Sequence, residues 1–315
     1  RAHPDWILHA PQRASCHGRN QYVLDFSRKE VVDCIYDMMY KILSESKISY
    51  IKWDMNRSIT ECYSVALPAD RQGEVFHRYI LGVYDLYDRL TTAFPQILFE
   101  SCASGGGRFD PGMLYYAPQG WISDDTDAAE RVRIQYGTSM CYPISSMGSH
   151  VSVVPNHQLN RITSLHTRAN VAYFGTFGYE LDLNKLTDEE IAEVKAQIIF
   201  MKEYRELIQF GNFYRLKSPF DGNETVWMTV SEDKRKALVF WYRERNVVNA
   251  EFTRVRLQGL DPDLIYKNEY NGTENYGDEL MNLGLLTTDV TAGEPTNEDL
   301  PCTDYESRIY VLTAE

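Results

Sequence analysis

The sequence lacks a long apolar run, because nothing in its 315 residues approaches the roughly 20 consecutive apolar positions of a membrane-spanning helix. Cationic residues are also few: 32 Lys and Arg stand against 45 Asp and Glu, for a net charge of −13. Nucleic-acid affinity comes largely from cations that neutralise phosphates, so this balance argues against a nucleic-acid-binding surface. We therefore expect neither a membrane partner nor a nucleic-acid partner.

Cysteine and histidine are scattered without the spacings that bind metals. The six cysteines form no CxxC pair and no regular framework, which suits a reducing compartment. The seven histidines contain no HxH or HExxH spacing, so we expect no metal site. The start of the chain, Arg1 to Trp6, is neither a secretory signal nor an initiation site, and we interpret the chain as a piece of a longer protein.

Short apolar runs alternate with amphipathic helical patterns up to residue 211. The pattern predicts strands over residues 48–53, 97–99, 121–122, 151–154 and 171–177. It predicts helices after a Ser27–Glu30 capping box, over 74–94, over 128–136 behind Asp127, and from a Thr187–Glu190 capping box to Gly211. The helix after Ser27 is expected to gather Met38 and Ile42 on its apolar face with four other side chains.

The predicted strands are apolar without alternation, which is typical of a parallel sheet covered by helices. Polar residues follow the strands at their C-terminal ends, as they do in (β/α)8 barrels. Only about five strand–helix units are present, whereas a closed barrel needs eight. We therefore predict an α/β fold with an incomplete (β/α)8 TIM-type barrel over residues 1–211.

The pattern of apolar residues changes after Phe213. Short strands are predicted over residues 226–230, 237–241, 250–256, 264–267 and 308–312. Turn signals such as Asn271-Gly272 separate them, and no helical period accompanies them. We predict an antiparallel β-sandwich domain over residues 212–315.

Asp54 directly follows the strand predicted over residues 48–53. Lys52 points to the same face of that strand, because side chains alternate along a strand. A neighbouring ammonium group lowers the pKa of a carboxyl and keeps it ionised, as a nucleophile requires. A structural Lys–Asp pair at a strand end explains the two residues equally well.

Asp124, Asp125 and Asp127 crowd together after Trp121. Like charges raise one another's pKa and an apolar wall adds desolvation, so one carboxyl of this group suits a general acid. Solvated loop and capping roles explain the same residues. For Asp127, helix capping is the preferred interpretation.

A glycine-rich turn, Cys102-Ala103-Ser104-Gly105-Gly106-Gly107-Arg108, follows the strand over residues 97–99. Its glycines let a ligand approach the backbone closely. It has neither the Lys-Ser/Thr of a P-loop nor the spacing of a dinucleotide fingerprint. With no histidine beside it in the sequence, Cys102 is expected to pack against a ligand rather than attack one.

Six segments carry the most specific patterns: YVLDFSR at 22–28, YIKWDMNR at 50–57, ESCASGGGRFD at 100–110, SDDTDA at 123–128, MGSHVSVVPNHQ at 147–158 and GYELDL at 178–183. On these segments the chain resembles the α-galactosidases of glycoside hydrolase family 36, over nearly its whole length. The chain resembles the C-terminal part of the family members, which comprises the second portion of the barrel and the β domain that follows. Family members are longer, so the resemblance implies that three barrel strands and part of the sugar pocket lie upstream. The isolated piece is then expected to be unstable and inactive.

The resemblance implies a retaining α-galactosidase that acts on melibiose and raffinose-type oligosaccharides. Asp54 would be the nucleophile and Asp124 the acid/base of a double displacement. It also implies a cytoplasmic homotetramer that uses no cofactor. The alternatives are an α-N-acetylgalactosaminidase, a galactosyl-transferring relative, or a non-catalytic carbohydrate-binding fragment.

Five further residues match substrate-binding positions of the family. By the resemblance, Lys52 and Asn56 would contact the galactose and orient the nucleophile. Cys102 and Gly105 would line the side of the sugar that bears the 2-hydroxyl. Arg19 matches a family arginine near the sugar pocket.

Overall fold

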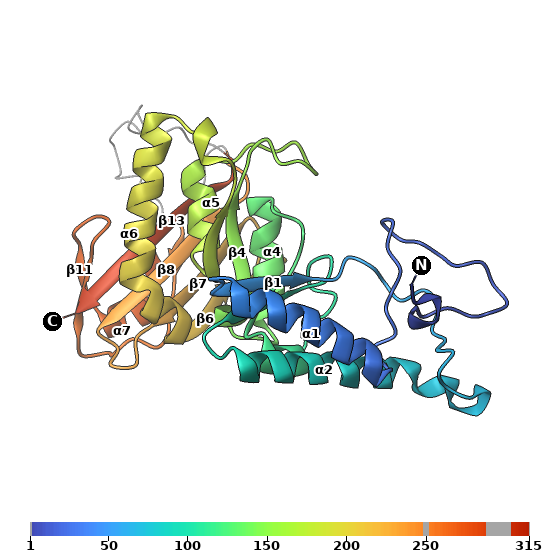
Figure 1. The fold of residues 1–315 in the computed structure, drawn as a ribbon. Helices are drawn as coiled ribbons and strands as arrows, with labels where there is room; N and C mark the ends of the chain where they lie inside the picture. The colour runs from blue at the N-terminus through green and yellow to red at the C-terminus, as the bar shows by residue number, and fades with distance from the viewer. Residues whose placement is uncertain (1, 248–251, 288–303, 315) are drawn as a thin grey trace. The chain divides into compact units, whose positions relative to one another are not determined.

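A computed structural model describes the chain except for residues 1, 248–251, 288–303 and 315 (Figure 1). The chain divides into two compact units, Arg1–Asp124 and Asp125–Glu315. The predicted fold class is confirmed, because five parallel strands precede an antiparallel sheet. The predicted division into domains at residue 211 remains a prediction.

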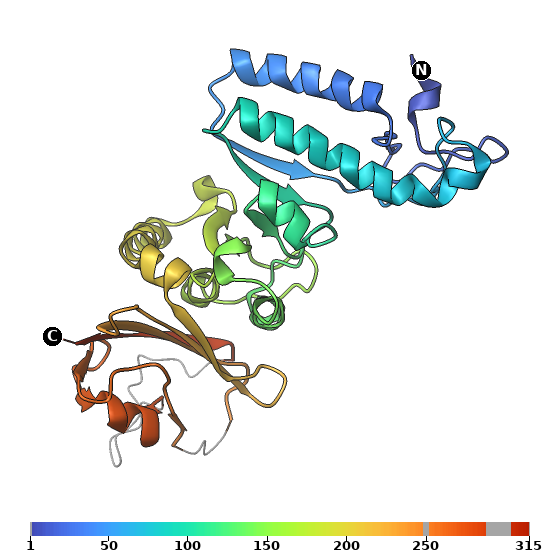
Figure 2. The same cartoon turned by 90° about the horizontal axis from the view of Figure 1, so that it is seen from below.

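The first unit contains a parallel sheet in the order β1-β2-β3. Its strands are β1 (Tyr50–Asp54), β2 (Leu98–Cys102) and β3 (Gln119–Trp121), and its helices are α1 (Lys29–Glu45), α2 (Val75–Ala93) and α3 (Pro111–Tyr116). Two short 3-10 helices, Pro4–Trp6 and Ala69–Glu74, complete it. Figures 1 and 2 show α1 and α2 lying side by side along the same face of β1. Val32, Leu86 and Phe99 meet in the core between them.

The helices of this unit differ from the predictions at the start of α1, on its apolar face and in α3, which was not predicted. Helix α1 begins at Lys29 behind Arg28, with no side-chain cap, so the predicted Ser27–Glu30 capping box is wrong. The Ser27 hydroxyl instead donates to Asp25, and Glu30 forms an ion pair with Arg28. Met38 and Ile42, expected on the apolar face of α1, are 51% and 57% exposed.

The second unit begins with the parallel pair β4 (Met147–Ser152) and β5 (Thr176–Glu180). Its helices are α4 (Ala128–Ser139), α5 (Leu165–Ala172) and α6 (Asp188–Phe210), with 3-10 turns at Ile144–Ser146 and Leu183–Lys185. The Thr187–Glu190 capping box at the start of α6 is confirmed, as is Asp127 as the N-cap of α4.

Two predicted strands of the second unit are partly wrong. The strand expected over residues 151–154 is β4, which begins at Met147 and ends at Ser152. The strand expected over residues 171–177 begins at Thr176, because residues 171 and 172 belong to α5. Ser164 caps that helix by accepting from the Thr167 amide, and the apolar residues that follow are buried on a helix rather than in a strand. An apolar run alone does not distinguish these two outcomes.

The rest of the second unit is an antiparallel sheet in the order β11-β10-β13-β8-β7-β6. Its strands are β6 (Asn212–Lys217), β7 (Glu224–Val230), β8 (Lys236–Arg243), β10 (Ile265–Asn268), β11 (Glu274–Tyr276) and β13 (Glu306–Ala314). One face packs against the short pair β9 (Arg254–Val255) and β12 (Leu285–Leu286) and against α7 (Gly277–Asn282), which Figure 2 shows on one side of the sheet.

The antiparallel domain is confirmed, with a second layer much smaller than the first. Helix α7 was not predicted, since its six residues are too few to show a period. The predicted strand over residues 250–256 falls partly outside the described residues, and its visible part is β9.

Candidate active site

The C-terminal end of β1 presents an exposed carboxylate that is held by a neighbouring amide. Asp54 is the last residue of β1, and the side-chain amide of Asn56 donates to its Oδ2 atom. The Oδ1 atom of Asn56 accepts from the backbone N–H of Ser104 at 3.1 Å and from its hydroxyl at 3.2 Å. The glycine-rich turn after β2 therefore fixes Asn56, and Asn56 orients Asp54.

Cys102 ends β2 and pairs in register with Asp54. Its side chain is buried, and burial together with the adjacent Asp54 carboxylate raises the pKa of the thiol to about 11. The thiol is therefore neutral at neutral pH, and the carboxylate of Asp54 lies within its reach. That Cys102 packs against a ligand rather than attacking one remains a prediction.

Gly105 brings the glycine-rich turn against the chain that follows β3. Its φ is +80°, a backbone conformation that glycine adopts without strain. A Cβ at this position would lie 2.7 Å from the Cα of Ser123 and 2.9 Å from the backbone N of Asp124. The close approach of the two segments depends on the absence of a side chain.

Asp124 follows β3 and is exposed, like Asp54. The indole N–H of Trp121 donates to its Oδ1 atom at 2.9 Å. Trp121 was expected only as an apolar wall beside the carboxylates; it also provides the hydrogen bond that orients Asp124.

Lys52 makes a different ion pair from the expected one. Its Nζ atom lies 3.8 Å from Oε1 of Glu100 on β2, rather than in an ion pair with Asp54. The same ammonium lies 4.6 Å from the centre of the Trp121 ring. Lys52 thus stands among the three strands, between a buried carboxylate and the indole that holds Asp124.

Arg19 lies on an exposed turn that a buried arginine fastens to the chain after β1. Gly18 and Gln21 exchange both backbone hydrogen bonds across this turn, and Arg19 has a φ of 52°. The Arg57 side chain donates to the carbonyls of Gln21 at 3.3 Å and Cys16 at 2.9 Å. The predicted site residue Arg19 is therefore tied to the segment that carries Asp54, although no contact joins the two directly among the interactions described here.

Four residues of this region were not singled out from sequence: Glu100, Ser104, Arg57 and the indole donor of Trp121. Glu100 had a detectable signal, since a charged residue inside an apolar strand two positions before Cys102 shares its face. The contacts of Ser104 and Arg57 join segments far apart in the chain and leave no local pattern, whereas Trp121 and Asp124 are only three positions apart. Within the described ranges, no group of three or more His, Cys, Asp or Glu side chains could hold a metal ion.

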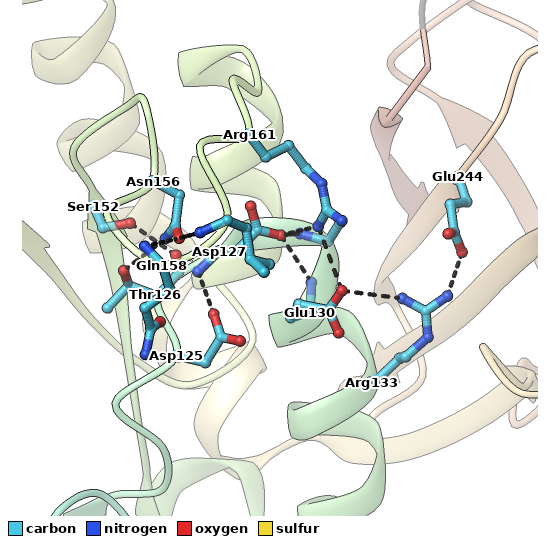
Figure 3. Close-up of polar contacts among 12 residues, drawn as sticks. Asp125, Thr126, Asp127, Glu130, Arg133, Ser152, Asn156, Gln158, Arg161 and Glu244 are labelled. Atoms are coloured by element: carbon cyan, nitrogen blue, oxygen red, sulfur yellow. Dashed lines mark hydrogen bonds and ion pairs between the residues drawn. The ribbon is translucent and has the colours of Figure 1, made fainter.

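The residues after Asp124 form a separate polar network in the second unit (Figure 3). Asp127 accepts from the backbone N–H groups of Ala129 and Glu130 and pairs with Arg161. Asp125 accepts from the Asp127 amide at 3.0 Å. These two aspartates therefore organise the start of α4, as the capping interpretation of Asp127 predicted.

Comparison with known proteins identifies related chains over the same region. The chain matches Melibiase over residues 1–211 and the glycosyl hydrolase family 36 C-terminal domain over residues 224–312. α-Galactosidase AgaA of Geobacillus stearothermophilus is 55% identical over 285 residues, which are 90% of this chain and 39% of AgaA. α-Galactosidase Mel36A of Lactobacillus acidophilus is 53% identical over 283 residues, or 90% of this chain and 38% of Mel36A.

Solved structures agree with these matches. A crystal structure of AgaA matches 100% of this chain and 42% of its own with a TM-score of 0.93 at 52% identity. A structure of an AgaA variant in complex with raffinose matches with a TM-score of 0.93 at 51% identity and the same coverage. The chain spans about two fifths of the length of the relatives it matches. The family matches, together with this identity, show that the chain belongs to the melibiase family, within glycoside hydrolase family 36.

Proposed function

We propose that the whole protein is a retaining α-galactosidase and that this chain supplies both of its catalytic carboxylates. The observation that carries the proposal is the placement of Asp54 at the end of β1 and of Asp124 after β3 of one parallel sheet, both exposed and each oriented by its own donor. Carboxyl ends of parallel strands meet at one edge of a sheet, where barrel enzymes place their active sites.

In the proposed mechanism Asp54 attacks the anomeric carbon while Asp124 gives its proton to the leaving oxygen. Asp124 then acts as a base and activates water, which releases the sugar from its ester with Asp54. Asn56 keeps one oxygen of Asp54 directed by its hydrogen bond, and Cys102 and Gly105 face the same end of the sheet. Lys52 and Arg19 are proposed to contact the sugar.

The proposed substrates are oligosaccharides with a terminal α-linked galactose, such as melibiose and raffinose. Support comes from relatives whose structures hold raffinose or stachyose. The described residues include no helix that is long and apolar enough to cross a membrane. We also propose a cytoplasmic homotetramer, for which light scattering of the purified whole protein and cell fractionation are the tests.

The test is hydrolysis of 4-nitrophenyl α-galactoside by the 315-residue chain and by the same chain with its native upstream sequence. We expect activity in the extended protein, and a loss of at least about 10⁴-fold in kcat for Asp54→Ala, because the nucleophile cannot be replaced by its neighbours. Asp110→Asn is the matched control, since Asp110 caps α3 outside the site and Asn caps equally well. An active Asp54→Ala protein would refute the assignment.

Azide separates the two carboxylate roles. With an activated aryl substrate, azide should rescue Asp54→Ala by direct displacement and give the β-galactosyl azide. In Asp124→Ala the first step still forms the β-linked ester, so azide should give the α-galactosyl azide. The opposite pair of products would mean that the two roles are exchanged, and absence of both would count against the double displacement.

A further inference from the structure

Glu100 is a buried carboxylate at the centre of the first unit's sheet, with no part in the mechanism above. Its side chain is 1% exposed, and it pairs in register with Lys52 on β1 and Gln119 on β3. Side chains alternate along a strand, so Glu100 shares a face of β2 with Cys102. A carboxylate removed from water is costly unless charges and hydrogen bonds compensate it, so its partners matter.

Hydrogen bonds hold one oxygen of Glu100 and leave the other directed at a cation. The Tyr50 hydroxyl and the Gln119 side-chain amide both donate to Oε2, the latter at 2.9 Å. Gln119 also donates to the Tyr50 hydroxyl at 3.1 Å, which closes a triangle around the carboxylate. The Lys52 ammonium lies on the Oε1 side, at 3.8 Å.

Lys52 lies between Glu100 and the surroundings of both proposed catalytic residues. It shares a face of β1 with Asp54, two positions away. Its ammonium lies 4.6 Å from the centre of the Trp121 ring, and Trp121 donates to Asp124 at 2.9 Å. A cation over an indole ring is attracted to it, so the position of the ammonium and the position of the ring depend on each other.

We infer that Glu100 is a positioning residue, whose negative charge holds the Lys52 ammonium against Trp121 beneath the two aspartates. The inference rests on the proposed function, because its effect is read through that site. The competing explanation is that Glu100 only fills and stabilises the sheet, in which case its shape matters more than its charge.

A matched pair of variants in the extended protein separates charge from shape. Glu100→Gln keeps the shape and removes the charge, and we expect kcat/KM for 4-nitrophenyl α-galactoside to fall about 100-fold, as for a misplacement of about 1 Å. Glu100→Asp keeps the charge in a shorter side chain, and we expect it to retain at least about ten times the kcat/KM of Glu100→Gln, since Coulomb attraction falls only gradually with distance. The reverse order would overturn the inference, because it is the order that a purely structural role predicts.

A double-mutant cycle tests whether Glu100 acts through Lys52. In a Lys52→Met background, Glu100→Gln should change kcat/KM by less than about threefold, because the group it positions is gone. If the two losses multiply independently, Glu100 does not act through Lys52. Urea unfolding of each variant, with the activity normalised to folded protein, removes effects of stability.

Crystal structures of the two variants give a readout that does not need turnover. We expect the Lys52 ammonium to leave the Trp121 ring in Glu100→Gln and to stay in Glu100→Asp. An unmoved ammonium in Glu100→Gln would overturn the inference even in an active enzyme. If the unmodified protein is inactive but the Lys52 ammonium moves in Glu100→Gln as expected, the result counts against the proposed function and still supports the positioning role.

Discussion

At the scale of single residues, the site shows how neighbours prepare each carboxylate for a different task. Asp54 is held by an amide that is itself held by Ser104. Asp124 is held by an indole N–H, which can only donate. Neither donor carries a formal charge, and the Lys52 ammonium forms its ion pair with Glu100 rather than with Asp54.

The buried thiol of Cys102 leads to a prediction about its reactivity. Burial and the nearby Asp54 raise the pKa of its thiol to about 11. Because the thiolate is the reactive form, iodoacetamide at pH 8 should modify the exposed Cys16 and Cys141 well before Cys102 in the folded protein. Peptide mapping by mass spectrometry measures the order, and equal rates at Cys102 and Cys16 would contradict the burial described here.

The same shift has a consequence for stability. The folded state favours the neutral thiol of Cys102. The contribution of this thiol to the free energy of unfolding is therefore fully present below the unfolded pKa of 9.0. It is lost as the pH rises from there through the folded pKa of about 11. A Cys102→Ala variant should therefore show a weaker loss of stability over this alkaline range than the unmodified protein.

At the scale of elements, the glycine-rich turn after β2 determines how closely the end of β3 approaches. Gly105→Ala would place a Cβ 2.7 Å from the Cα of Ser123 and force an alanine to a φ of +80°. We expect kcat/KM to fall at least about tenfold, because the backbone that carries Asp124 must shift. Steady-state kinetics of the extended protein provides the measurement.

Gly73→Ala is the matched control for that prediction. Gly73 lies in the 3-10 helix before α2, and a Cβ there would meet nothing within 4 Å. It should change kcat/KM by less than about threefold, as for other surface substitutions away from special backbone positions. If both alanines have the same effect, the close contact at Gly105 does not explain its role.

The start of α4 gives a stability prediction. Asp127 both caps the helix and pairs with Arg161, and its side chain is 1% exposed (Figure 3). Asp127→Ala should therefore lower the free energy of unfolding by about 3 kcal/mol, since it removes a cap and leaves the partly buried Arg161 with only its longer contact to Glu130, at 3.5 Å.

A second helix start provides the comparison. Thr187→Ala removes the exposed cap of α6 and should cost only about 1 kcal/mol, because water can satisfy the groups left behind. Urea unfolding of both variants measures the difference. Equal losses would mean that the Arg161 pair contributes nothing beyond the cap.

At the scale of the whole molecule, all seven predicted site residues fall within the first compact unit, Arg1–Asp124. The chain corresponds to about two fifths of the length of these relatives, so the proposed activity is tested in the whole protein. Both predicted halves of the fold, the incomplete parallel barrel and the antiparallel domain, are confirmed. The sequence patterns located these halves because strand period and helix period are local properties.

The sequence by itself determined the features that depend on neighbours along the chain. The caps at Asp127 and Thr187 and the end of α2 before Pro95 are of this kind, and so are the aspartates at the end of β1 and after β3. The predicted cap at Ser27 is wrong, because the Ser27 hydroxyl, which fits a capping pattern, donates to Asp25 instead. Only the tertiary structure decided that Lys52 pairs with Glu100 rather than Asp54, and that Gly105 lies against Ser123. These contacts join residues 48 and 18 positions apart, so they depend on strand register and close packing, which no local pattern in the sequence encodes.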